Sequence, residues 1–274
     1  MISAPPDGVL DLFAVPGSVS AVPGGRGGRV VAGDLVLSPH RDPQLHAWLS
    51  PQLARLAVLA DERPDRKRRD LRIAMPVPAR DGSWVVQGWA ASRFEAGTTA
   101  CSDVNVAVAA GRLLHAQLAV TFPQRPPALV SRDVRSDRAE RLAFSAASPL
   151  LTAALGKPGA DVVRRVEPSL DDRSVGRDQL VHLDLASSLL LDARGAPVVV
   201  NLEPAWRPAR WAEALAVVEA VLADRAALSV LEPWTTGLNR QAVLRALIYR
   251  AFGDETADLA HYEDILAVVA PELD

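Results

Sequence analysis

The chain has 274 residues and a formal net charge of −3, and 49% of its residues are hydrophobic while 23% are charged. This composition is typical of a globular protein with a sizeable core, and it excludes a chain that is disordered throughout. The mild negative charge also excludes the broad basic field that attracts nucleic acid or anionic lipid.

The single cysteine, Cys101, excludes a disulfide framework and a cysteine-based zinc site. No apolar run reaches the roughly 18 residues of a membrane span. The N-terminal segment carries Asp7 and Asp11 and no basic residue, whereas a signal peptide begins with basic residues and continues with an apolar stretch. We therefore expect a cytoplasmic protein whose partners include neither nucleic acid nor a membrane.

The first third of the chain predicts a small antiparallel sheet. Residues 21–28 form a loop rich in glycine, and residues 29–37 predict two short strands around a Gly33–Asp34 turn. Residues 71–77 and 84–90 predict two further strands, which a polar turn joins.

One helix is inserted into this sheet. Apolar side chains recur at three- and four-residue spacing over residues 43–59, and Pro43 suits a first helical turn. Pro51 predicts either a kink or a new start of the helix. The charged residues that follow, 61–70, predict a solvated loop.

From residue 100 onward the helical period dominates. The chain predicts a helix over 103–118, a polar loop over 161–172, apolar runs over 179–185 and 189–192, a strand over 197–202, and helices over 209–224, 237–252 and 256–269. This order predicts an α+β protein with two lobes and a cleft between them. We expect an N-lobe over 1–90, a hinge near 88–97 and a mostly helical C-lobe over 91–274.

Four motifs follow one another in a fixed order: a glycine-rich hairpin, a strand, a His-x-Asp loop and a strand that ends in polar residues. They are Gly24-Gly25-Arg26-Gly27-Gly28, Leu35-Val36-Leu37-Ser38-Pro39, His182-Leu183-Asp184-Leu185 and Val198-Val199-Val200-Asn201-Leu202-Glu203. Over about residues 8–252 the chain resembles the kinase-like fold of aminoglycoside phosphotransferases and choline kinases. The Trp206-Arg207-Pro208 segment resembles an actinobacterial branch of that superfamily.

The resemblance implies a nucleotide cleft in the N-lobe. Its candidate residues are Gly24, Gly25, Gly27, Gly28, Arg29 and Ser38. Ser38 stands where the resemblance implies a lysine that contacts the α- and β-phosphates, and its hydroxyl carries no charge. The helix over 43–59 contains no Asp or Glu, so the acidic partner of that lysine is also missing. Joint loss is physically consistent, because a buried carboxylate without its lysine is costly.

The resemblance also implies metal ligands, and these positions are degenerate. Ser188 stands at the position of a metal-binding asparagine, and Asn201 at that of the main Mg²⁺ aspartate. Glu203 is a possible substitute, because strand alternation would place it on the same face as Asn201.

The catalytic base implied by the resemblance is kept. Asp184 stands in His-Leu-Asp-Leu, where these phosphotransferases usually have His-Gly-Asp-Leu, and His182 has the matching spacing. Asp184 and His182 are therefore the candidate catalytic residues. Leu183 in place of glycine predicts a less open backbone at this loop.

The remaining aromatic, histidine and arginine positions have simpler interpretations. We expect the tryptophans to be packing anchors and His115 to be a helical residue with one polar contact. A run of arginines predicts a solvated helix face with acidic partners. It comprises Arg132, Arg135, Arg138 and Arg141, with Asp133, Asp137 and Glu140 as the partners.

Loss of the phosphate lysine and both metal ligands removes most of the electrostatic stabilisation that phosphoryl transfer needs. The leading hypothesis is therefore a pseudokinase-like binding or regulatory module with no ordinary kinase activity, whose partner is an unknown small molecule or protein. The alternative is an active small-molecule phosphotransferase, with Asp184 as base and Glu203, Ser188 and Asp192 as metal ligands. Only in that alternative are ATP and Mg²⁺ cofactors; otherwise the cofactor is unknown. A third hypothesis is that the cleft serves another ligand.

Overall fold

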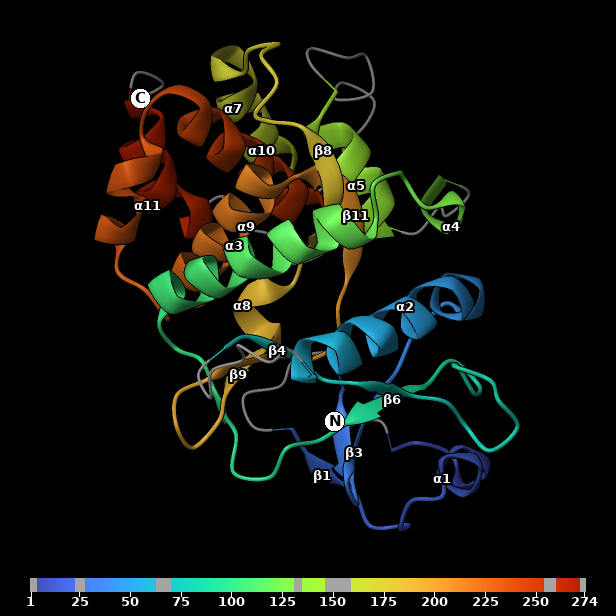
Figure 1. Ribbon diagram of the computed structural model, residues 1–274. Coiled ribbons are helices and arrows are strands. Elements are labelled where there is room, and N and C mark those ends of the chain that lie inside the picture. Colours follow the sequence, from blue (N-terminus) through green and yellow to red (C-terminus); the bar gives the residue numbers. More distant parts are fainter. Residues whose placement is uncertain are drawn as a thin grey trace. The chain divides into compact units, whose positions relative to one another are not determined.

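The computed structural model describes residues 4–22, 28–62, 70–130, 135–145, 159–253 and 260–271 (Figure 1). The chain forms two compact units. The first comprises Met1–Ser102 and Ser187–Glu203, and the second comprises Asp103–Ala186 and Pro204–Asp274. The expected lobe boundary near residue 90 stays a prediction. Among the described residues, no helix combines the length and the apolar character that crossing a membrane requires.

The first unit contains a five-stranded antiparallel sheet in the order β1-β2-β3-β6-β5. Its strands are β1 (Ser20–Ala21), β2 (Val30–Ala32), β3 (Leu35–Ser38), β5 (Pro76–Val77) and β6 (Ala90–Arg93). Two helices accompany it, α1 (Asp7–Phe13) and α2 (Pro43–Asp61). The expected small sheet with an inserted helix is confirmed, and Gly33 makes the β2–β3 turn with a φ of 60° that favours glycine.

Helix α2 begins and ends close to the predicted residues. Its N-cap is Asp42, whose side chain accepts hydrogen bonds from the backbone N–H groups of Gln44 and Leu45. Pro43 occupies the first turn, where its missing N–H costs nothing. The helix continues through Pro51 as a single element, so there is no new start at that residue.

The strand predicted over residues 84–90 is wrong, and a tight turn replaces it. Gln87 and Gly88 have φ angles of 49° and 80°, and Val86 and Trp89 exchange two backbone hydrogen bonds of 2.8 Å. A two-residue turn with two positive φ angles reverses the chain, so the strand begins only at Ala90.

A second sheet in the first unit has the order β4-β10-β9-β7. Its strands are β4 (Arg72–Ile73), β7 (Thr99–Ala100), β9 (Leu189–Leu191) and β10 (Pro197–Val199). Strand β10 pairs with β4 in parallel, and a small apolar cluster of Ala74, Leu190, Val198 and Val200 lies beside them. The predicted strand over 71–77 is thus divided between two sheets, and the segment Ser187–Glu203 completes the first unit.

The second unit is mostly helical. Its helices are α3 (Val104–Thr121), α4 (Pro127–Val130), α5 (Arg135–Ala143), α7 (Ala160–Val166), α9 (Ala209–Leu222), α10 (Gly237–Gly253) and α11 (Ala260–Val269), with short 3₁₀ turns η1 (Glu167–Ser169) and η2 (Leu228–Trp234). Helix α8 (Leu185–Ser188) leads the chain back into the first unit. Strands β8 (Asp178–His182) and β11 (Pro204–Pro208) form an antiparallel pair.

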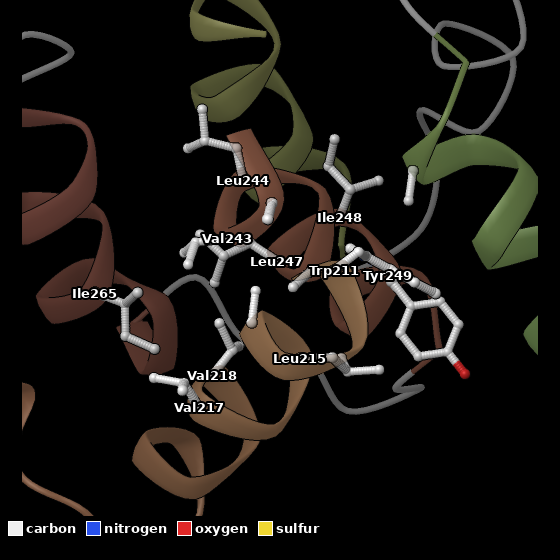
Figure 2. Packing of buried hydrophobic residues seen from close by; sticks show 14 of the residues in the cluster. Trp211, Leu215, Val217, Val218, Val243, Leu244, Leu247, Ile248, Tyr249 and Ile265 are labelled. Carbon is white, nitrogen blue, oxygen red and sulfur yellow. The ribbon is translucent and has the colours of Figure 1, made fainter. Parts of the chain in front are cut away.

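The core of the second unit is built around α9 and α10, which pack against each other. Figure 2 shows side chains of α9, α10 and α11 gathered there. Trp211 is fully buried. Its ring packs edge-on against those of Phe144 and Tyr249, with distances of 5.1 and 5.4 Å between the ring centroids. The interpretation of Trp211 as a packing anchor is confirmed.

Two predictions for the second unit are wrong. Residues 160–166 form helix α7 instead of a loop, because Val162, Val163 and Val166 share one buried face despite the polar neighbours. The predicted solvated face of α5 is wrong for its acidic residues, since Asp137 and Glu140 are both buried. Arg138 and Arg141 are exposed as expected, and Arg132 and Asp133 lie outside the described residues.

The Trp-Arg-Pro segment explains the burial of Glu140. The Arg207 guanidinium lies 2.7 Å from the Glu140 carboxylate and 4.3 Å from the centre of the Phe144 ring. Burial raises the pKa of Glu140, while the charge of Arg207 opposes that rise. The segment therefore has a structural role in joining β11 to α5.

Candidate functional site

The predicted site residues divide between the two units. Gly24, Gly25 and Gly27 lie outside the described residues. Gly28 has a φ of 72°, a conformation that suits glycine at the entry to β2.

Arg29 is the first residue of the predicted nucleotide site with a defined environment. It is buried, with 5% of its surface exposed. One nitrogen of its guanidinium donates to the Oγ of Ser188 at 3.2 Å, and the other donates to the carbonyl of Ser187 at 3.1 Å. The structure thus brings together Arg29, predicted to bind the nucleotide, and Ser188, predicted to bind the metal. The positive charge beside Ser188 is the guanidinium of Arg29.

Ser38 and Asn201 also lie near each other. Both line a cavity of about 40 Å³, to which α2 contributes His46 and Ser50. The two α2 side chains are joined by a 3.0 Å hydrogen bond. A cavity of this size has room for about one water molecule, whereas small-molecule sites are typically 300–1,000 Å³. The cavity beside Ser38, where the resemblance implies a phosphate lysine, is therefore lined by no lysine, arginine or carboxylate among the described residues.

The predicted relation between Asn201 and Glu203 is wrong. Strand β10 ends at Val199, and Asn201 has a φ of 60°, so the alternation of a strand does not continue to Glu203. Asparagine tolerates this left-handed conformation because its short polar side chain can bond locally. Glu203 instead forms a 2.7 Å ion pair with Arg41, a residue that the sequence analysis did not single out.

Asp192, the third metal ligand of the alternative hypothesis, holds the β9–β10 turn. One carboxylate oxygen accepts from the backbone N–H groups of Arg194 and Ala196, both at 2.8 Å. The other accepts from Arg72 at 2.9 Å. The hydrogen bonds from Ala196 and then Arg194 hold the pKa of Asp192 below its ordinary value.

These residues do not fit a magnesium ion. Mg²⁺ prefers octahedral oxygen ligands at about 2.0–2.1 Å, with carboxylates to balance its charge. Here a guanidinium faces Ser188, another faces Glu203, and Asn201 is neutral. Within the described ranges, no three His, Cys, Asp or Glu side chains gather as a metal site.

The second unit holds the His-x-Asp loop. His182 ends β8 and is fully buried, and its Nδ1 accepts a hydrogen bond of 3.3 Å from the backbone N–H of Asp184. The backbone N–H of His182 in turn donates to Nε2 of His115 at 3.2 Å. The candidate base Asp184 is therefore placed by a turn that His182 closes, and His182 is placed by α3.

His115 is confirmed as a helical residue with a polar contact, and its environment keeps it neutral. It is 1% exposed, and burial, followed by the electrostatic effect of His182, lowers its pKa to about 3. A neutral ring is what the contact requires, because Nε2 can accept a hydrogen bond only without a proton.

The rest of the loop is also anchored. Leu183 is buried in the core of the second unit, so its side chain accounts for the replacement of glycine. Arg225 donates to the carbonyl of Ala186 at 2.7 Å. Gly111 of α3 leaves room for Leu185, since a Cβ there would lie 2.4 Å from a Leu185 methyl group.

Solved structures of other proteins share this architecture. An aminoglycoside phosphotransferase from Alicyclobacillus acidocaldarius superposes with a TM-score of 0.53 at 16% identity, over 99% of this chain and 94% of that one. Choline kinase LicA from Streptococcus pneumoniae superposes with a TM-score of 0.51 at 10% identity, over 97% of each chain. Neither the models of protein families nor the curated proteins include a match to this sequence. The chain therefore has the α+β, kinase-like fold that its motif order resembles.

Proposed function

We propose that this phosphotransferase-fold protein is a pseudokinase-like binding or regulatory module, without ordinary Mg²⁺- and ATP-dependent transfer. The observation that carries the proposal is that arginines bind two of the three predicted metal ligands. Arg29 donates a hydrogen bond to the hydroxyl of Ser188, and Arg41 forms an ion pair with the carboxylate of Glu203.

Electrostatics supports this proposal. Phosphoryl transfer depends on positioning and on neutralising the triphosphate, and the guanidiniums beside Ser188 and Glu203 repel a divalent cation. The neutral residues Ser38 and Asn201, around a cavity of about 40 Å³, add no charge that would offset this repulsion.

Thermal unfolding with ATP, in the presence and absence of MgCl₂, tests the proposal. A ligand at a hundred times its Kd stabilises the folded state by about 2.7 kcal/mol, which such an assay detects. We expect no magnesium-dependent stabilisation of the wild-type chain. A clear magnesium-dependent shift that Glu203→Gln abolishes contradicts the proposal.

The active phosphotransferase is the second candidate, and the closed His182–Asp184 turn is the observation that favours it. Release of ADP, measured on the wild type and on Asp184→Asn, separates the two. Turnover that requires Asp184 supports the enzyme, whereas release that is absent, or unaffected by Asp184→Asn, supports the binding module.

A further inference from the structure

The second unit contains a cavity of about 770 Å³ that none of the predicted nucleotide, metal or catalytic residues lines. Its walls come from α3, the segment 175–179, the start of α9, η2 and the first turn of α10. Helix α3 packs along α9 in this unit (Figure 1). The volume lies in the range of about 300–1,000 Å³ that small-molecule sites occupy.

The floor of this cavity is apolar. Val104 and Val108 of α3, Val217 of α9 and Trp234 of η2 line it, and each is at most 9% exposed. The indole of Trp234 offers a flat apolar surface with a donor at one edge. Such a floor suits a ligand with a ring or another compact apolar body.

The rim of the cavity is positively charged. Three arginines and one carboxylate line it, and Arg112 lies 2.9 Å from Glu213, so these two neutralise each other. Arg210 donates to the neutral amide oxygen of Asn239. Arg177 is exposed and forms no hydrogen bond or ion pair with the described residues. Two guanidiniums therefore have no carboxylate partner among the residues that line the cavity.

The start of α9 adds to this charge. The helix begins at Ala209 on the rim, and its N-cap, Pro208, provides no side-chain hydrogen bond to the first-turn N–H groups. Free N–H groups at a helix N-terminus carry a partial positive charge. The cavity and the two arginines define the site, and the helix end increases its preference for an anion.

We propose that this cavity binds a small organic dianion, such as a phosphate monoester or a dicarboxylate, with its apolar body against Trp234. Guanidinium groups pair with both anions through two parallel hydrogen bonds. The site is independent of the function proposed above, because no residue implicated in nucleotide or metal binding takes part in it.

Titration with phenyl phosphate, which combines a ring with a dianion, tests this proposal. Binding is measured by calorimetry and by the NMR signal of the Trp234 indole N–H, which Trp234→Phe identifies among the six tryptophans. Phthalate serves as a dicarboxylate and benzyl alcohol as a neutral comparator. We expect the dianions to shift the Trp234 signal and benzyl alcohol to leave it in place at the same concentration.

The arginine variants locate the binding site. Arg177→Ala and Arg210→Ala should each weaken phenyl phosphate binding about tenfold, the effect of losing one charge-assisted contact. Arg164→Ala, which removes an exposed guanidinium of the same unit outside the cavity, should leave binding unchanged. Absence of binding by both dianions overturns the proposal, as does unchanged affinity in both rim variants or equal binding of benzyl alcohol. Because these probes contain neither nucleotide nor metal, their outcome does not depend on the ATP experiment.

Discussion

The two parts of the candidate site keep the residues that the resemblance implies to very different degrees. In the first unit, the predicted phosphate and metal positions carry Ser38, Ser188 and Asn201, and Arg29 binds one of them. In the second unit, His182 and Asp184 keep the spacing that the resemblance implies, and a hydrogen bond between them closes a turn. The difference is explained by what each group does for folding.

The His-x-Asp loop is part of the folded core. His182 is fully buried, and its Nδ1 accepts a hydrogen bond from the backbone N–H of Asp184, so a change of this side chain removes an acceptor from that N–H. The predicted phosphate and metal positions of the first unit have no comparable structural constraint. Ser38 and Asn201 are neutral, and Ser188 is bonded to Arg29. Retention of His182 therefore has a structural reason and is not by itself a sign of catalysis.

The largest expected effect tests the buried histidines. The pKa of His115 is about 3 in the folded chain against 6.5 ordinarily, so the unfolded state binds the extra proton first as the pH falls. This stability is complete above pH 6.5 and is lost as the pH falls toward 3. The free energy of unfolding should drop by about 3 kcal/mol between pH 6.5 and pH 4 from this residue alone.

Urea unfolding across this pH range measures the effect. His115→Gln, which can still accept from the His182 N–H, should flatten the pH dependence, whereas His40→Asn, a change at an exposed histidine, should not. An unchanged slope in His115→Gln would mean that the second unit is not held by a neutral histidine.

A smaller effect tests the arginine that faces Ser188. Arg29→Ala removes hydrogen bonds to Ser188 and Ser187 from a buried place, so it should destabilise the chain by about 2 kcal/mol. Arg29→Lys should recover less than half of this loss, since an ammonium group does not reproduce the planar geometry of a guanidinium. Equilibrium unfolding in urea provides the measurement.

The exposed pair Arg93–Asp34 supplies a matched control. Arg93→Ala should cost less than about 0.5 kcal/mol, because exposed ion pairs contribute little. If Arg29→Ala is as mild as Arg93→Ala, the arginine is not a fixed part of the first unit and the contrast between the units weakens.

The smallest effect concerns the Arg41–Glu203 pair, whose side chains are 12% and 30% exposed. A double-mutant cycle of Arg41→Gln and Glu203→Gln should give a coupling below about 1 kcal/mol that decreases at high salt. Magnesium that stabilises Arg41→Gln and not the wild type would show that Arg41 is what excludes a cation from Glu203. Absence of any coupling would contradict a role for Arg41 in holding the Glu203 carboxylate.

Local patterns predicted much of the fold. The β2–β3 hairpin and helices α2, α3, α9 and α10 follow apolar periodicity and turn residues, and the structure confirms them. The prediction failed where charged residues hid the apolar periodicity of a helix, and where positive φ angles ended a strand that the sequence pattern continued. Helix α7 lies in a segment rich in charged residues but has a buried valine face, and the positive φ angles of Gln87 and Gly88 end a strand pattern.

The site was less predictable because its contacts connect distant parts of the sequence. Arg29 and Ser188 are 159 positions apart, and Arg41 and Glu203 are 162 apart, so no local pattern links them. The simultaneous loss of a lysine at Ser38 and a carboxylate on α2 indicated that the charge arrangement had changed. It did not indicate which arginines would pair with the remaining oxygens.

The parallel pairing of β10 with β4 has a consequence for synthesis on the ribosome. Residues 1–102 are synthesised long before the segment 187–203. During this interval β4 and β7 therefore lack β10 and β9, the strands with which they pair in the folded protein. Unpaired strand edges are templates for aggregation during that interval. A chain interrupted before residue 187 therefore lacks an intact first unit. Chaperone binding during translation should be strongest after residue 102 and before residue 203 has been synthesised.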